Sequence, residues 1–158
     1  MIKPFERVNA RSRTPVGARR YGGAVPPILL LAAVLAAEDV SFVLVGSAAL
    51  YLYGYLIPVA DIDAVPAPDA GNLARLHAAL AVLVRDGRVP SIRSLGAADV
   101  VSVRTSYGGL DCLLGRGRRD WDRLREGARQ VRVSDTGVML ASAATVTALR
   151  RSHKRTIR

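Results

Sequence analysis

Apolar residues along the chain recur in two patterns, one typical of helices and one typical of short strands. The clearest helical pattern places Leu73, Leu76, Leu80 and Leu83 three or four residues apart, with Asp69 as the N-cap. Together the helical patterns predict helices over residues 28–37, 47–53, 70–85, 119–128 and 143–153, the last capped by Ser142. Runs of β-branched and apolar residues predict strands over 41–45, 59–65, 99–105, 110–114, 131–133 and 138–140.

Two short polar segments predict turns between neighbouring strands. Residues 106–109, SYGG, lie between two strand-like runs and favour an antiparallel hairpin. Residues 135–137, DTG, predict a second turn near the end of the chain. We find no repeat and no interdomain linker, and a chain of 158 residues suits one domain.

The apolar run at residues 28–37 needs a check against export, because a basic stretch precedes it. The basic leader is long, and Pro26-Pro27 stands directly before the run. Ten apolar residues are also too few to span a membrane. We therefore interpret the run as a core helix and expect a cytoplasmic protein with no membrane partner.

The formal charge of +10 is concentrated at the two ends of the chain. Residues 1–23 carry six basic residues against Glu6, a net charge of +5, and residues 150–158 carry another +5. The body, residues 24–149, holds 12 basic and 12 acidic residues. We therefore divide the chain into a basic N-terminal arm (1–23), a central domain (24–149) and a basic C-terminal tail (150–158). Basic ends on a neutral body favour a polyanionic partner, nucleic acid first and an anionic surface second.

Few side chains are available for thiol or imidazole chemistry. Cys112 is the only cysteine, so no intramolecular disulfide and no thiolate zinc cluster can form. His77 and His153 are the only histidines, which argues against a histidine metal site or a Ser-His-Asp triad. We expect both histidines at the surface.

Three aspartates stand in apolar strands, where burial of a charge is costly without a partner or a cation. Asp61 and Asp63 are two residues apart and so share one face of a strand, and Asp111 lies in the run 110–114. Clustered carboxylates can hold hard divalent cations, which activate an attacking hydroxyl and stabilise a leaving pyrophosphate. The Gly46-Ser47 turn adds backbone N–H groups suited to phosphate. Together these parts describe nucleotidyl transfer.

The order and spacing of these signals resemble a known superfamily. Residues 45–47, VGS, and residues 61–64, DIDA, stand thirteen residues apart and resemble the hG[GS]…Dh[DE]h signature of the nucleotidyltransferase superfamily, which includes DNA polymerase β-like enzymes. Asp111 falls where that superfamily has its third carboxylate. The resemblance implies an α+β fold, with a small mixed sheet and flanking helices.

Within that superfamily, residues 28–151 look most like the minimal bacterial nucleotidyltransferases related to abortive-infection and mycobacterial toxins. Toxins of this group add nucleotides to the 3′ end of tRNA and are restrained by a cognate antitoxin. The resemblance thus implies an NTP, a tRNA and an antitoxin as partners. The chain departs from its relatives at Ile57 and Val59, where they often have Arg and Thr or Ser, and at Arg150, which takes the place of a Lys.

The resemblance also implies roles for single residues. Asp61 and Asp63 would hold the metal ions, Mg²⁺ or alternatively Mn²⁺. Asp111 would share the second metal ion and help to deprotonate the acceptor hydroxyl. All three are therefore both catalytic and metal-ligating candidates.

Nucleotide binding would fall to a second group of residues. Gly46 and Ser47 would bind the β- and γ-phosphates of the NTP, and Arg150, with Lys154, would contact the triphosphate. Two other functions stay open at this point. One is an antibiotic nucleotidyltransferase with a small-molecule acceptor, and the other is a catalytically inactive nucleotidyltransferase fold that serves as a binding module.

Overall fold

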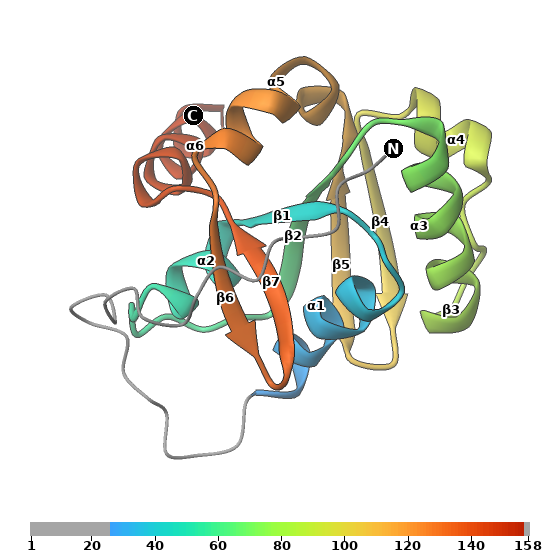
Figure 1. Ribbon diagram of the computed structural model, residues 1–158, viewed down its shortest axis with the longest axis horizontal. Coiled ribbons are helices and arrows are strands. Elements are labelled where there is room, and N and C mark those ends of the chain that lie inside the picture. Colours follow the sequence, from blue (N-terminus) through green and yellow to red (C-terminus); the bar gives the residue numbers. More distant parts are fainter. Residues whose placement is uncertain (1–25, 157–158) are drawn as a thin grey trace.

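A computed structural model describes residues 26–156, without the side chains of 116–118 and 150–156. In this part of the chain six helices flank one sheet of seven strands (Figure 1). The helices are α1 (Pro27–Ala37), α2 (Gly46–Leu52), α3 (Ala70–Leu83), α4 (Ile92–Ala97), α5 (Leu114–Glu126) and α6 (Ala143–Thr156). The strands are β1 (Phe42–Val45), β2 (Asp61–Pro66), β3 (Val84–Asp86), β4 (Val100–Thr105), β5 (Gly108–Leu113), β6 (Arg129–Val133) and β7 (Thr136–Leu140).

The sheet is mixed, with the strand order β3-β4-β5-β2-β1-β7-β6. β2 runs parallel to β5, β1 runs parallel to β7, and the other neighbours are antiparallel. The α+β prediction of a small mixed sheet with flanking helices is therefore confirmed. β2, which carries the Asp-x-Asp pair, is the central strand of the seven.

α1 crosses one face of the sheet and is buried on nearly all sides (Figure 1). Leu29, Leu31 and Leu35 are at most 1% exposed, which explains why the run is apolar throughout rather than amphipathic. A Cβ on Gly108 of β5 would collide with the side chain of Ile28. The even-numbered residues of β5 therefore face α1, and the odd-numbered ones, Asp111 among them, face the other side of the sheet.

Asn72 ties α3 to the central strands. Its side chain is fully buried, accepts a 2.7 Å hydrogen bond from the backbone of Ser41, and donates to the carbonyls of Ser41 at 2.8 Å and Ala67 at 2.9 Å. These bonds join the start of β1 to the end of β2. Asp69 caps α3 as predicted, because its carboxylate accepts a 2.8 Å bond from the backbone N–H of Asn72.

Several element boundaries differ from the sequence-based expectation. α5 begins at Leu114 rather than at residue 119, because the carbonyl of Asp99 accepts bonds from the N–H groups of Leu114 (2.8 Å) and Gly115 (3.0 Å) and so supports the first turn. The final turn lies at 134–135 rather than at 135–137, with Ser134 at a φ of 54°. β3 and α4 were not predicted, and α6 extends beyond residue 153 to Thr156.

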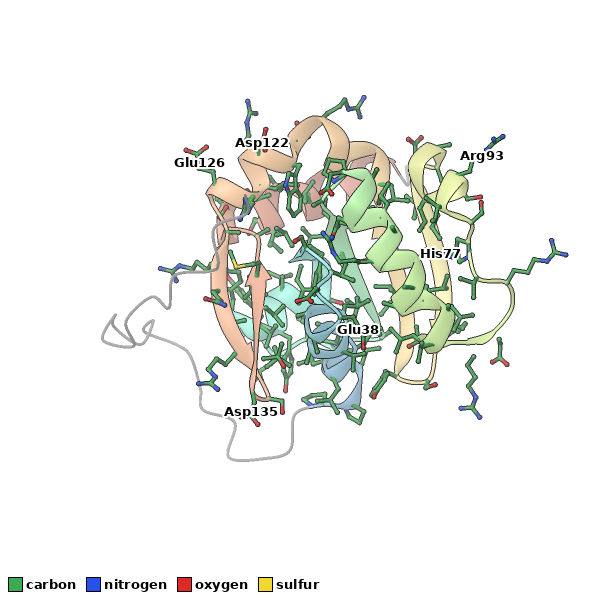
Figure 2. The ribbon with its side chains drawn as sticks, turned by 45° about the vertical axis from the view of Figure 1, so that its right-hand side comes forward. Glu38, His77, Arg93, Asp122, Glu126 and Asp135 are labelled. Carbon is green, nitrogen blue, oxygen red and sulfur yellow. The ribbon has the colours of Figure 1, made fainter. Side chains whose placement is uncertain are left out.

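His77 is half-buried rather than a plain surface residue. Its Nδ1 lies 2.8 Å from the carbonyl of Pro90, which joins α3 to the segment before α4 (Figure 2). The side chain of His153 lies outside the described residues, as does the basic arm of residues 1–23. The proposed tail of 150–158 continues α6 as far as Thr156, so the division into arm, domain and tail stays a prediction. Among the described residues, no helix is both long and apolar enough to cross a membrane.

Candidate active site

The three candidate carboxylates lie on one face of the two central strands. In the parallel pairing of β2 with β5, Asp63 is opposite Asp111 and Asp61 is opposite Gly109. Residues opposite one another in a sheet project to the same face, about 4.8 Å apart. This face is the one away from α1, and the rest of the candidate site is built on it.

Each carboxylate is turned toward a different neighbour. Asp111 accepts a 2.5 Å hydrogen bond from the hydroxyl of Ser102, the residue opposite it on β4. The carboxylate of Asp63 lies against Gly46, and that of Asp61 lies over Gly109, so that a Cβ on either glycine would collide with a carboxylate oxygen. Glycine at these two positions is therefore what allows the carboxylates to sit where they do.

The three carboxylates share a face without converging on one point. Within the described residues, no three acidic, His or Cys side chains come close enough to form a ready-made metal site. The donor set nevertheless suits a hard divalent cation, because carboxylate oxygens are its preferred ligands and such ions often take further oxygens from water and substrate phosphates. Asp63 and Asp111, opposite one another, are the pair best placed to share an ion.

Gly46 and Ser47 stand directly after β1, beside Asp63. Val45 is opposite Asp63 in the antiparallel pairing of β1 with β2. Gly46 has a φ of 67°, a left-handed conformation that glycine adopts without strain, and it begins α2. Both Gly46 and Ser47 are half-buried, so each keeps some contact with solvent.

Sequence reasoning missed an open groove of about 310 Å³ beside the carboxylates. It is lined by Asp61, Asp86, Gly87, Arg88, Ser102, Val103, Arg104, Gly109 and Asp111. The antiparallel hairpin places Arg104 opposite Gly109 and Ser102 opposite Asp111. The predicted turn of residues 106–109 would have placed Arg104 opposite Asp111. The turn spans only residues 106–107, so Thr105 pairs with Gly108 and it is Ser102 that lies opposite Asp111.

Arg150 and Lys154 lie in α6, but their side chains are outside the described residues. α6 itself is held near α2, because the hydroxyl of Tyr53 donates a 2.6 Å bond to the carbonyl of Ala141, just before α6. Burial raises the pKa of Tyr53 above 10.0, and the positive charge of Arg129 partly offsets this effect. The α6 backbone is thus anchored to the element that carries Gly46 and Ser47.

Cys112 takes no part in this face. It is 1% exposed, and burial, with the negative charge of Asp111 adding to it, raises the pKa of its thiol to about 12. A second hollow, of about 260 Å³, is lined in part by Asp39, Trp121 and Gln130 and contains none of the predicted site residues. The groove beside Asp61 and Asp111 is therefore the relevant one.

The seven-stranded mixed sheet with its flanking helices is also found in a solved protein structure. A crystal structure of a proposed nucleotidyltransferase from Thermotoga maritima superimposes on this chain with a TM-score of 0.58 at 16% sequence identity. The match covers 87% of this chain and 91% of the Thermotoga chain. No protein-family model and no curated protein sequence matches the chain.

Proposed function

We propose that this protein is a metal-dependent nucleotidyltransferase that moves a nucleoside monophosphate from an NTP to an RNA acceptor. The observation that carries the proposal is the register of the two central strands, which puts Asp63 opposite Asp111 on the face that also bears Asp61. Aligned carboxylates of this kind suit phosphoryl chemistry, in which positioning and charge neutralisation supply most of the catalysis.

Each residue then has a distinct role. Asp61, Asp63 and Asp111 would hold Mg²⁺, or Mn²⁺ in its place, with Asp63 and Asp111 placed to share an ion, and the metal would neutralise charge on the phosphates. The acceptor hydroxyl oxygen bonds to the α-phosphorus as the bond to the pyrophosphate oxygen breaks. Asp111 takes the hydroxyl proton, and the hydroxyl of Ser102, which donates a hydrogen bond to Oδ1 of Asp111, holds the carboxylate in position for that step.

The NTP phosphates lie on the β1 side of the carboxylates. There the left-handed Gly46 lets the backbone approach a phosphate closely, and Ser47 offers a hydroxyl and an N–H. Arg150, with Lys154, contacts the triphosphate from α6, whose anchoring beside α2 supports this assignment. Arginine suits such a contact because its donors match phosphate oxygens in pairs.

We propose that the acceptor is the 3′ end of tRNA, and that the protein acts in the cytoplasm as the toxin of a toxin-antitoxin system. The support is the resemblance set out above and the +5 charge at each end of the chain. An antibiotic nucleotidyltransferase is less well supported, because cationic drugs would gain nothing from the basic ends or from Arg88 and Arg104 at the groove. A cognate antitoxin protein is the expected partner.

One incubation tests these functions against each other. Purified protein is mixed with Mg²⁺, each α-labelled NTP in turn, and either total tRNA or a panel of aminoglycosides. Label on tRNA is the expected result, and label on a drug would replace the RNA acceptor with a small molecule. With no label on either acceptor, the protein would be an inactive nucleotidyltransferase fold that binds without catalysis.

A further inference from the structure

We propose that Arg88 and Arg104 form a second anion site in the groove, which binds the backbone phosphates of the acceptor strand. The ligand class is a single-stranded nucleic acid that ends in a free hydroxyl. The inference rests on the proposed function, which it deepens by separating the acceptor's site from that of the NTP.

The position of Arg104 follows from one row of residues across the sheet. Arg104 is opposite Gly109 on β5, and Gly109 is opposite Asp61 on β2. Because Gly109 has no side chain, the carboxylate of Asp61 lies over it and extends toward Arg104 at the floor of the groove. A phosphate held by Arg104 would therefore lie beside the carboxylates without displacing them.

Both arginines are exposed and available to a ligand. Asp86, which also lines the groove, is opposite Arg104 in the pairing of β3 with β4. Yet among the described residues the one ion pair within 4.0 Å is that of Arg132 with Asp135, far along the chain. Guanidinium groups that face a groove without a carboxylate partner can form paired hydrogen bonds with phosphate oxygens.

The two proposed anion sites lie on opposite sides of the strands that carry the carboxylates. Gly46 follows β1 and Arg104 lies on β4, with the carboxylate strands β2 and β5 between them. At about 4.8 Å for each strand spacing, β1 and β4 are about 14 Å apart. An NTP bound at Gly46 and an acceptor strand bound at Arg104 would thus approach the carboxylates from opposite sides, as an in-line transfer requires.

The test measures binding, so that it does not depend on turnover. A fluorescein-labelled single-stranded RNA of about twelve nucleotides, a length that suits one binding groove, is titrated with the full chain at several salt concentrations. Arg104→Gln and Arg88→Gln are expected to bind it about tenfold more weakly than the parent, with the slope of log K against log[salt] reduced by about 0.7 each. Affinity for NTP should stay at the parent value.

Two further variants serve as controls. Arg93→Gln removes an exposed arginine of α4 that points away from the body of the protein (Figure 2), and it should leave the RNA affinity and the salt slope unchanged. Arg104→Lys keeps the charge and should retain the slope while losing part of the affinity. Circular dichroism confirms that each variant is folded.

Each outcome decides between the claims. Parent-like RNA binding and slope in the groove variants would overturn the acceptor site, and so would a parent that binds no RNA. A loss of NTP binding in Arg104→Gln would assign the groove to the nucleotide instead. If the groove variants lose RNA binding while the parent transfers no nucleotide, the acceptor site stands and the proposed reaction fails.

Discussion

The hydroxyl of Ser102 donates a 2.5 Å hydrogen bond to Oδ1 of Asp111, its direct neighbour across the β4–β5 pair. The bond fixes the orientation of the carboxylate, and Ser102 itself has no place in the reaction. We expect Ser102→Ala to lower kcat about tenfold with KM for the NTP unchanged, as is typical when a ligand loses its orienting partner. Ser102→Thr should retain activity. Ser106→Ala, at the exposed hairpin turn, is the matched control, and equal loss there would contradict a positioning role.

Replacing any one of Asp61, Asp63 and Asp111 by Ala should abolish nucleotide transfer and leave the fold intact. These carboxylates repel one another when no cation is bound, so removing one costs the free protein little stability. Thermal melts should show a rise with Mg²⁺ and NTP in the parent that the variants lose. Asp122→Ala on the outer side of α5 (Figure 2) is the control, and retained activity in Asp63→Ala would exclude the two-metal reaction.

Gly109→Ala tests whether the absence of a side chain at residue 109 is needed to keep the Asp61 carboxylate in place. The new Cβ would collide with the carboxylate of Asp61, and this exposed side chain can swing into solvent. We therefore expect activity to fall at least tenfold while the free energy of unfolding changes by less than about 1 kcal/mol. Gly96→Ala, where a Cβ meets nothing within 4 Å, should leave activity unchanged. A fully active Gly109→Ala would mean that Asp61 need not stay in place.

Gly46→Val should weaken NTP binding more than Ser47→Ala does. A β-branched residue is strained at a φ of 67° and its side chain would collide with Asp63, whereas Ser47→Ala removes one of several donors. Isothermal titration with a non-hydrolysable NTP measures both. If both variants bind NTP as the parent does, the phosphates lie elsewhere.

Deleting residues 1–20 should weaken tRNA binding without affecting NTP binding. The deletion removes all six basic residues of the arm, whereas the candidate nucleotide contacts begin at Gly46. If about five phosphates are neutralised in the full chain, log K against log[salt] should slope at about −3.5 to −4.5, and the deletion should flatten it. An unchanged slope would make an antitoxin or an anionic surface the likelier partner of the arm.

The buried thiol of Cys112 is expected to make the free energy of unfolding fall at high pH. Its folded pKa of about 12 lies above the 9.0 of an exposed thiol, so the unfolded chain releases this proton first. The contribution is therefore fully present below pH 9.0 and is lost as pH rises toward 12. Denaturant unfolding at about pH 8 and about pH 10 should show a smaller decline in Cys112→Ala than in the parent. An equal decline in stability in both proteins would contradict a contribution from the Cys112 thiol.

Much of the fold could be predicted because its elements carry strong local patterns. The spacing of Leu73 through Leu83 and the cap at Asp69 suffice for α3, and the two strand-like runs around residues 106–109 suffice for the hairpin. β3 and α4 escaped prediction because they are three and six residues long, and α4 buries only Leu95. The start of α5 was predicted too late because Gly115 and Gly117 lie in its first turns, and glycine is a poor helix former.

The candidate site was predictable only where local spacing decides it. The alternation of a strand is enough to put Asp61 and Asp63 on one face. The pairing of Asp63 with Asp111 joins segments 48 residues apart, and no local pattern encodes such a long-range register. Arg88 escaped notice because it follows a strand of three exposed or half-exposed residues that the apolar pattern does not mark.

The strand order also means that the two halves of the site differ in how easily they unfold locally. Asp63 sits on the middle strand of seven, where exchange of amide hydrogens requires opening close to global unfolding, whereas β3 is a short edge strand that can fray alone. The segment around Arg88 can therefore accept insertions and substitutions that the carboxylate strands cannot. Substitutions around β3 and Arg88, whether natural or engineered, could therefore change the acceptor that is bound while the catalytic carboxylates stay unchanged.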